Sequence, residues 1–378
     1  MDAARNNLYL CGYKMSKRPA VRYYCYIGTN GLCIAAKDYV ASLYMKGVDV
    51  DVRPLNQAKR PIKGVSAVDD ILALSYEKRV NYDTVIAHCI PNRFKEIRER
   101  EGNVHIIGLV VWETTKLPQD YIDSLKYADE FVVPCEWNKS LFAQYTKKKI
   151  SVVHHVIQCP TAQYPIMLPS SFIFYFIGEW CQRKGIEDLI RIFTKTFFRK
   201  EKVLLYIKTF IFDNVMSSCE FEDYLTQKHR SQNIIINTEK SSDDFISALH
   251  QRADCYVSLA RGEGVGIPIC QAEAYGNRTM CMGFGGQIDY LSDPIIIDHK
   301  LIDCDPCTSY HGNKCGTTCS LYKCYTGMNQ KWAVHTSDDA VGKQMMKVYD
   351  ERHVVRQRRA KHGKFTLETI GIKMKKLL

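Results

Sequence analysis

The sequence predicts an α/β protein built from two parallel-sheet domains. In both halves of the 378-residue chain, apolar runs of strand length alternate with segments of helical spacing. Such alternation is typical of βαβ units and of parallel sheets covered on both faces. Between the halves, Pro160, Pro165 and Pro169 interrupt any regular pattern and indicate a linker. Because ligands of open α/β sheets bind beyond the carboxyl ends of the strands, we expect a cleft there between the domains.

The first half alternates strands and helices in chain order. The expected strands are residues 22–27, 48–52, 84–88, 106–111, 130–133 and 150–153, and the expected helices are residues 32–46, 119–127 and 137–145. Gly28, Thr29, Asn30 and Gly31 form a turn after the first strand. We assign residues 1–160 to an N-terminal domain and residues 161–170 to the linker.

The second half continues the alternation. Its expected strands are residues 172–177, 203–208, 234–237, 256–259 and 280–283, and its expected helices are residues 186–198, 221–227, 243–250, 269–275, 341–351 and 367–378. We assign residues 171–345 to a second domain that contains a cysteine-rich insert, residues 304–324. Residues 346–378 form a basic C-terminal helical segment.

Composition indicates an ordinary globular protein, with 46% hydrophobic and 25% charged residues. No apolar run approaches the roughly 18 residues that span a bilayer. Residues 1–10 contain no secretory apolar region, so we expect a cytoplasmic protein. Many of the 16 cysteines lie within apolar patterns, where they usually behave as small buried hydrophobes. Without an export signal, a disulfide framework is not expected.

The net charge of +11 is concentrated at the C-terminus. Residues 343–378 contain 11 Lys or Arg against 3 Asp or Glu. A nucleic-acid-binding protein would spread a basic face over the fold, so no nucleic-acid partner is expected. A basic C-terminal helix fits contact with an anionic membrane surface or a phosphorylated ligand. The alternative is a solvated helix face.

The loop that follows the strand 256–259 is the most informative stretch. Glu263 lies in a glycine-rich turn, and Gly264 and Gly266 remove side chains where a ligand must approach the backbone. The free N–H groups of the next helix, together with Val265 and Ile267, form an anion site. A carboxylate beside an anion site suits a phosphate ester that also carries sugar hydroxyls.

This loop resembles the signature of family 4 of the retaining nucleotide-sugar glycosyltransferases. In that family two glutamates flank a run of the form E-G-F-G-x-P, and this chain has Glu263, Gly264, Val265, Gly266, Ile267 and Pro268. The resemblance implies that Glu263 faces the donor sugar. The second glutamate, which binds the donor ribose in the family, is replaced by Gln271. Its amide forms hydrogen bonds but not the stronger charge-assisted ones.

The resemblance covers nearly the whole chain and implies the GT-B fold, in which two Rossmann-like domains face each other across a cleft. The second domain of that fold binds the donor, and the first shapes the acceptor side. The last helix crosses back, so residues 346–378 are expected to pack on the N-terminal domain. The fold normally needs no divalent metal, and no cofactor beyond the donor substrate is expected.

Two cations follow the strand 172–177. Arg183 and Lys184 precede a helix N-terminus, which cations usually avoid because the helix dipole repels them. An anion between them and the helix would explain their position, with Arg183 gripping a diphosphate and Lys184 acting as a point charge. Family members carry a matching lysine, but the place of their arginine is taken by Glu179. The alternative is a pair of solvated surface cations.

Four further residues are candidates. His88 ends a strand, and the family places a histidine in the same pocket. Glu113, in a run resembling the family's W-E-T-x-x-L-P, would face an acceptor hydroxyl, with Trp112 as a stacking surface. Lys208 ends a strand and could neutralise the donor or snorkel. Gly31 could let the chain pass close to the diphosphate.

The cysteine-rich insert departs from the family pattern. Cys304, Cys307, Cys315 and Cys319 could hold a structural zinc ion, although their spacing matches no standard zinc finger. Free thiols and disulfides are the other possibilities.

These observations predict a cytoplasmic retaining glycosyltransferase. Its donor would be a UDP-, GDP- or ADP-sugar, and its acceptor a glycan, a glycoprotein or a lipid. A catalytically weak or inactive protein that binds sugar nucleotides or glycans is the second hypothesis, since Gln271 and Glu179 replace residues that the family uses. A zinc-dependent interaction module is the third.

Overall fold

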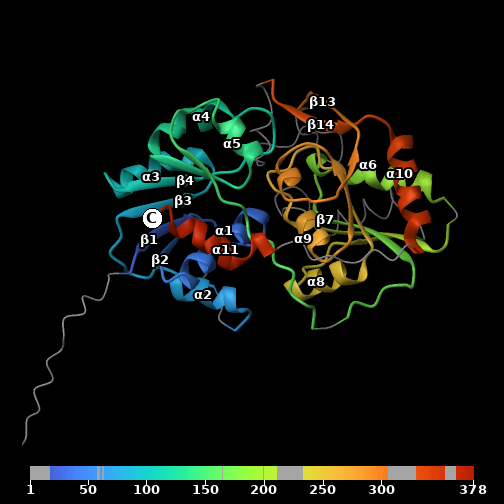
Figure 1. Cartoon of the computed structure of the whole chain (residues 1–378), viewed down its shortest axis with the longest axis horizontal. Helices are drawn as coiled ribbons and strands as arrows, with labels where there is room; N and C mark the ends of the chain where they lie inside the picture. The colour runs from blue at the N-terminus through green and yellow to red at the C-terminus, as the bar shows by residue number, and fades with distance from the viewer. Residues whose placement is uncertain are drawn as a thin grey trace, which may run out of the picture.

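The computed structural model describes residues 18–57, 60–61, 64–163, 165–198, 200–210, 233–304, 329–353 and 363–378. Figure 1 shows two lobes, one formed by the first part of the chain and the other by the green-to-orange part. Each lobe contains one six-stranded parallel sheet. The predicted fold class, two Rossmann-like α/β domains, is confirmed.

The first sheet has the strand order β2-β1-β3-β4-β5-β6. Its strands are β1 (Ala20–Cys25), β2 (Asp49–Pro54), β3 (Thr84–His88), β4 (His105–Leu109), β5 (Glu130–Val133) and β6 (Ile150–Val152). Successive strand residues point to opposite faces, so Tyr23 belongs to a core with α1, whereas Tyr24 belongs to a core with α3. Helices therefore cover both faces of this sheet.

The second sheet has the order β12-β11-β10-β7-β8-β9. Its strands are β7 (Phe172–Glu179), β8 (Val203–Phe210), β9 (Ile234–Asn237), β10 (Cys255–Ser258), β11 (Arg278–Met282) and β12 (Ile295–Ile297). Aromatic residues fill its core, among them Phe174, Tyr175 and Phe193, all 0% exposed. An antiparallel ribbon of β13 (His299–Asp303) and β14 (Lys331–His335) follows.

The helices connect the strands. They are α1 (Gly31–Met45), α2 (Ala67–Ser75), α3 (Phe94–Glu101), α4 (Gln119–Ser124), α5 (Glu136–Phe142), α6 (Ile186–Thr196), α8 (Asp243–Arg252), α9 (Ile267–Ala274), α10 (Asp338–Asp350) and α11 (Leu367–Lys375). Side-chain caps mark several starts: Asn30 accepts from the Cys33 N–H, and Ser242 accepts from the Phe245 N–H.

Some elements differ from the prediction. Helix α9 begins at Ile267 rather than at residue 269, because Pro268 is tolerated in the first helical turn. Helices α2 and α3 and the strands β12 to β14 were not predicted. Helix α3 is charged almost all round and buries only Phe94 and Ile97, so it has little apolar periodicity. The helix predicted at residues 221–227 lies outside the described residues.

The C-terminal helix α11 lies on the N-terminal lobe, beside α1 (Figure 1). Gly371 permits the approach, because a Cβ there would be 2.4 Å from the carbonyl oxygen of Ser42. Lys375 donates to the carbonyl of Lys46 at 2.8 Å, and the Lys46 ammonium pairs with Glu368 at 2.7 Å. Lys375, one of the cations expected to face a membrane or ligand, is thus engaged in the contact between α1 and α11.

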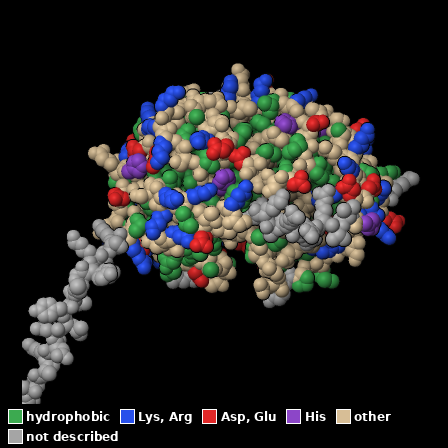
Figure 2. All heavy atoms as spheres, viewed as in Figure 1, with side chains coloured by type: hydrophobic (Ala, Val, Ile, Leu, Met, Phe, Trp, Pro, Cys, Tyr) green, Lys and Arg blue, Asp and Glu red, His purple; other side chains and the backbone are tan. Residues whose placement is uncertain are grey.

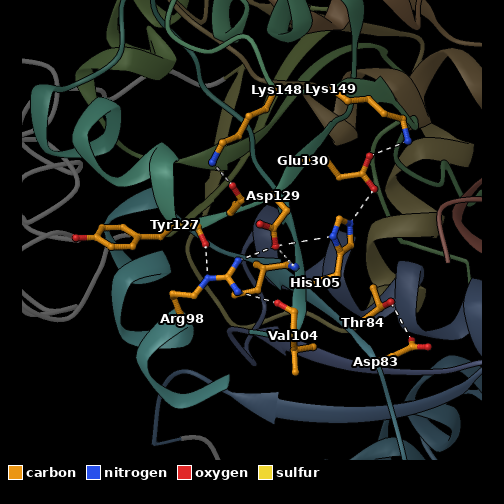
Figure 3. A network of polar contacts seen from close by, with 12 residues as sticks. Asp83, Thr84, Arg98, Val104, His105, Tyr127, Asp129, Glu130, Lys148 and Lys149 are labelled. Carbon is orange, nitrogen blue, oxygen red and sulfur yellow. Dashed lines mark hydrogen bonds and ion pairs between the residues drawn. The ribbon is translucent and has the colours of Figure 1, made fainter. Parts of the chain in front are cut away.

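A network of polar contacts lies at the amino-terminal ends of the strands of the first sheet (Figure 3). Arg98 donates to the carbonyls of Tyr127 and Val104 and pairs with Asp129 at 2.6 Å. Lys149 pairs with Glu130 at 2.7 Å. These residues lie at the starts of β4 and β5, whereas the carboxyl ends of the strands carry the candidate site.

On the face of the molecule shown in Figure 2, Lys and Arg side chains are intermixed with Asp and Glu side chains. Within the described part of the chain, none of the helices is both long enough and apolar enough to cross a membrane.

Candidate active site

The loop between β10 and α9 places Glu263 at the carboxyl end of its strand. Gly266 precedes the helix with φ +72°, a left-handed conformation that favours glycine. The Glu263 carboxylate is largely buried, since the residue is 8% exposed. Its main-chain carbonyl accepts from the Gly286 N–H at 2.9 Å, which anchors the loop to the turn after β11.

Arg183 and Lys184 approach this carboxylate from the turn after β7. Lys184 Nζ lies 2.5 Å from Glu263 Oε1, and Arg183 Nη1 lies 3.6 Å from Glu263 Oε2. Arg183 Nη1 also donates to the carbonyl of Gly262 at 2.7 Å. Gly185 allows the two turns to touch: its φ is +64°, and a Cβ there would be 2.3 Å from the Leu259 carbonyl oxygen. The expected convergence of both cations on Glu263 is present in the structure.

The loop after β4 of the first domain closes the site from the other side. Glu113 Oε1 lies 3.4 Å from Arg183 Nη2, so this ion pair joins the two domains. A Cβ at Gly262 would be 2.2 Å from the Glu113 carbonyl oxygen. Instead of an open cleft at this point, the structure shows the loops at the carboxyl ends of the two sheets in direct contact.

Three solved structures are similar to this protein in fold over 95% of the chain. They are HepE from Anabaena in complex with UDP and glucose (TM-score 0.62, 9% identity, 99% of that chain), sucrose-phosphate synthase from Thermosynechococcus elongatus (0.64, 12%, 98%) and a glycosyltransferase from Rickettsia africae (0.63, 11%, 97%). The chain has the GT-B fold. The similarity to the pneumococcal O-GlcNAc transferase GtfA covers 78% of this chain but only 56% of the GtfA chain, with a TM-score of 0.52 and 13% identity. No protein-family model and no curated protein sequence matches.

In this GT-B chain, Trp112 is not a sugar-stacking surface. The residue is 3% exposed and packs edge-on against Tyr121. Its indole Nε1 donates to Thr114 Oγ1 at 2.8 Å and to the Lys116 carbonyl at 2.6 Å. The expectation was wrong because the side chain turns into the core between α4 and the sheet.

His88 lies at the end of β3, but it is 0% exposed. Its Nδ1 is 2.9 Å from the Tyr23 hydroxyl, and the ring packs against Tyr39 and His155. Burial, and secondarily His155, lowers the pKa of His88 well below its ordinary value, so the ring is neutral at physiological pH. A sugar contact by His88 stays a prediction.

Lys208 is 7% exposed and does not snorkel to solvent. Its ammonium donates to the carbonyls of Glu239 at 2.6 Å, Thr209 at 3.3 Å and Asn237 at 3.4 Å. Burial lowers its pKa. The ammonium therefore holds the turn after β9, and its role toward a donor stays a prediction.

Gly31 is the first residue of α1, and a Cβ there would meet no described atom within 4 Å. Packing of the described residues does not require glycine at this position. The proposed approach of the diphosphate to Gly31 stays a prediction.

Gln271 connects α9 to the end of the N-terminal domain, just before the linker. Its Nε2 donates to the carbonyl of Gln158 at 3.1 Å, and Gln158 in turn donates to Asp38 Oδ1 on α1 at 2.5 Å. Gln158, at the end of the N-terminal domain, is thus hydrogen-bonded to α9 of the second domain and to α1 of its own. Of the other loop residues, Val265 is buried at 4% exposed, and Ile267 is partly buried.

The sequence did not indicate several residues that join the domains. Asp289 Oδ2 accepts from the Glu136 N–H at 2.5 Å, at the start of α5. The Tyr290 hydroxyl donates to the Pro134 carbonyl at 2.8 Å and accepts from the His155 N–H at 2.7 Å. An acidic residue is a common helix cap, but only the tertiary structure shows that it caps a helix of the other domain.

Asp38 gives stability a predicted dependence on pH. It is 3% exposed, and burial, opposed by Lys37 and Gln158, raises its pKa to about 7. An unfolded aspartate titrates near pH 4 (about 3.9). Its contribution to stability is therefore full below about pH 4 and is lost as the pH rises toward 7.

We expect Asp38→Asn, which cannot ionise, to gain stability relative to the original protein as the pH rises from about 4 to about 7. Above that range the difference should stay constant. Urea unfolding at several pH values measures the free energy of unfolding of both proteins. Histidines that titrate in the same range contribute equally to both, so their contribution cancels in the difference. If the free energies of unfolding of Asp38→Asn and of the original protein change with pH in the same way, Asp38 is not a buried, protonated residue.

The zinc prediction concerns four cysteines of the insert. Cys307, Cys315 and Cys319 lie outside the described residues, and Cys304 is half-buried at the end of the described segment. Within the described residues, no three His, Cys, Asp or Glu side chains are placed to hold a metal ion.

Proposed function

We propose that the protein is a retaining glycosyltransferase that moves a sugar from a nucleotide-diphosphate sugar to a glycan, glycoprotein or lipid acceptor. One observation carries the proposal: the buried Glu263 carboxylate lies within 3.6 Å of both Arg183 and Lys184, at the N-terminal end of α9. Such a site offers a carboxylate for sugar hydroxyls beside cations and N–H groups for a diphosphate. The likeness to HepE, which was solved with UDP and glucose, supports the same donor class.

Donor binding would rearrange the ion pairs. Lys184 and Arg183 are neutralised by Glu263 and Glu113 in this structure, and the diphosphate would take over part of that role. The first N–H groups of a helix have no acceptor within the helix and can donate to an anion. Because Pro268 has no N–H group, the N–H groups of Gly266 and Ile267 would donate to the diphosphate. Glu263 would then be released toward the sugar.

Catalysis by these residues would be mainly electrostatic. As the bond to the sugar breaks, negative charge develops on the leaving diphosphate, and Arg183 and Lys184 are fixed where they can stabilise it. The resemblance to family 4 implies attack from the face that the diphosphate leaves, and hence retention. Glu113 would orient the acceptor hydroxyl from the N-terminal domain.

The domains must separate to admit the donor. A Cβ at Gly264 would be 2.2 Å from Val111 Cγ2, so the two loops are already in contact. A sugar cannot lie between them in this arrangement. Closure after binding would exclude water, which otherwise hydrolyses the donor.

The experiment that tests the function is a survey of UDP-, GDP- and ADP-sugars. A bound donor should raise the melting temperature, and slow release of free sugar without acceptor should follow for the same donor. A protein that neither binds nor hydrolyses any of them would refute the proposal.

A non-catalytic sugar-nucleotide-binding protein is the second candidate. The Gln271 amide, in the position where the family uses a ribose-binding glutamate, donates to the carbonyl of Gln158 in the N-terminal domain. Nucleotide binding by calorimetry without sugar release over hours would favour this candidate.

We expect Gln271→Glu to tighten nucleotide binding by roughly tenfold, because a carboxylate accepts more strongly from ribose hydroxyls. The same change should lower the melting temperature, since a carboxylate cannot donate to the Gln158 carbonyl. Calorimetry and thermal unfolding measure the two effects. Unchanged nucleotide affinity would place the ribose elsewhere.

A further inference from the structure

Residues 330–333 are hydrogen-bonded to the loops of both domains that meet at the candidate site. The Lys331 N–H donates to Thr115 Oγ1 at 2.8 Å, and the Lys331 carbonyl accepts from the Thr115 N–H at 3.1 Å. On the other side, the Ala333 N–H donates to the Arg261 carbonyl at 2.7 Å. Strand β14 is thus attached to the loop of Glu113 and to the loop of Glu263. Figure 1 shows the β13–β14 ribbon beside the junction of the two lobes.

Gln330 extends this attachment through a buried chain of side chains. It is 1% exposed, and its side-chain oxygen pairs with the hydroxyl of Thr114, which is 0% exposed. The hydroxyl accepts from the Trp112 indole at 2.8 Å. Because the indole N–H can only donate, Thr114 accepts from Trp112. The single hydrogen of its hydroxyl can go to Gln330, whose oxygen is nearer than the other acceptor, the Lys116 carbonyl at 3.2 Å. The backbone of Gln330 is itself held, since its carbonyl accepts from the Cys304 N–H at 2.8 Å.

These hydrogen bonds hold the residues on both sides of Glu113. Glu113 stands between two residues that are both fixed: Trp112, whose N–H donates to Asn138 Oδ1 at 2.7 Å, and Thr114, which is held by Gln330. Its carboxylate is 3.4 Å from Arg183 Nη2. If Gln330 is removed, the Thr114 hydroxyl can still donate to the Lys116 carbonyl at 3.2 Å, within its own loop. The side-chain link between residue 330 and the loop of Glu113 is then lost, and the loop is less firmly held.

We propose that Gln330 is a positioning residue for the transfer reaction, acting through Thr114 to hold Glu113 opposite Arg183. This inference deepens the proposed function and rests on it. Because Lys184 and Glu263 make none of these hydrogen bonds, loss of Gln330 should impair turnover while donor affinity is kept.

The test compares Thr114→Val, which keeps the shape and removes the hydroxyl, with Thr114→Ser, which keeps the hydroxyl. We expect kcat to fall by about ten- to a hundredfold in Thr114→Val and in Gln330→Leu. The dissociation constant of the donor nucleotide should change by less than about twofold, and Thr114→Ser should restore most of the rate. The double variant Thr114→Val/Gln330→Leu should be no worse than either single one, because both break the same chain.

A second measurement does not depend on activity. Indole N–H signals of ¹⁵N-labelled tryptophan report on the four tryptophans of the chain, and Trp112→Phe identifies the Trp112 signal. In Gln330→Leu this signal should shift, whereas the signal of Trp180, buried in the second domain, should not.

The outcomes separate the two proposals. Wild-type kcat in Thr114→Val and Gln330→Leu, or equal losses of kcat and donor affinity, would overturn the positioning role and leave the transferase function standing. If the original protein transfers no sugar, the function fails, and the Trp112 signal still decides whether Gln330 holds this loop: an unmoved signal overturns it and a shifted one supports it.

Discussion

Sugar transfer is expected to fall by about 10²- to 10³-fold when Lys184 is replaced by alanine. Lys184 Nζ is 2.5 Å from Glu263 Oε1 and would stabilise charge on the leaving diphosphate. The loss should appear in kcat, because that charge develops only as the bond to the sugar breaks. Steady-state rates of donor consumption and product formation measure it, and circular dichroism shows whether the fold is retained. Glu263→Ala should lower turnover to a comparable extent.

Lys149→Ala is the matched control for Lys184→Ala. Lys149 also pairs with a glutamate, Glu130, at 2.7 Å, but this pair lies at the opposite edge of the first sheet (Figure 3). Lys149 is exposed although Glu130 is largely buried, and the pair lies away from the candidate site, so transfer should stay within about twofold of the original rate. If Lys184→Ala and Glu263→Ala both transfer sugar at the original rate, the proposed site is wrong.

Replacing Gly286 by alanine is expected to give a large loss of stability in this region. A Cβ there would be 1.9 Å from the Gly264 carbonyl oxygen and 2.6 Å from Cys135 Sγ. Backbone cannot yield as a side chain can, so the Glu263 loop must shift or the domains must move apart. We expect a loss of about 1–3 kcal/mol or more, with roughly 2–4 °C of melting temperature for each kcal/mol, together with a loss of transfer.

Gly31→Ala provides the comparison for stability. A Cβ at Gly31 would meet no described atom within 4 Å, and alanine is the better helix former at the first residue of α1. Its stability should be unchanged or higher by up to about 1 kcal/mol. Thermal unfolding of both variants side by side measures the contrast. Equal melting temperatures for Gly286→Ala and the original protein would show that the loops around Gly264 do not pack this closely in solution.

The elements around the site illustrate how far sequence reasoning reached. The strands at residues 84–88, 130–133 and 234–237 coincide with β3, β5 and β9. Their apolar, β-branched runs are bounded by polar residues and turns, a local pattern that survives folding. The position of Arg183, Lys184 and Glu263 after parallel strands was also a local property. Parallel strands of one sheet bring their carboxyl ends to the same edge, so the convergence of these residues could be expected from the order of the elements.

The partners of two side chains at strand ends were not predictable from the sequence. Trp112 and Lys208 have plausible functional positions at strand ends, but the direction of each side chain depends on the partners that the folded structure places around it. Trp112 turns inward because Thr114 and Tyr121 receive it, and Lys208 is held by the carbonyl of Glu239. A position at a strand end predicts the side of the sheet at which a residue lies, but it does not predict which residues its side chain contacts.

By itself, the sequence determined that the chain forms two parallel-sheet α/β domains and that a carboxylate and two cations follow strands of the second one. These features depend on periodicity and on short spacings, which are encoded locally. Only the tertiary structure decided that Glu113 meets Arg183, that Asp289 caps α5 of the other domain and that Gln330 reaches Thr114. Those contacts join residues far apart in the chain, and they exist only because two separately folded sheets pack with one particular orientation.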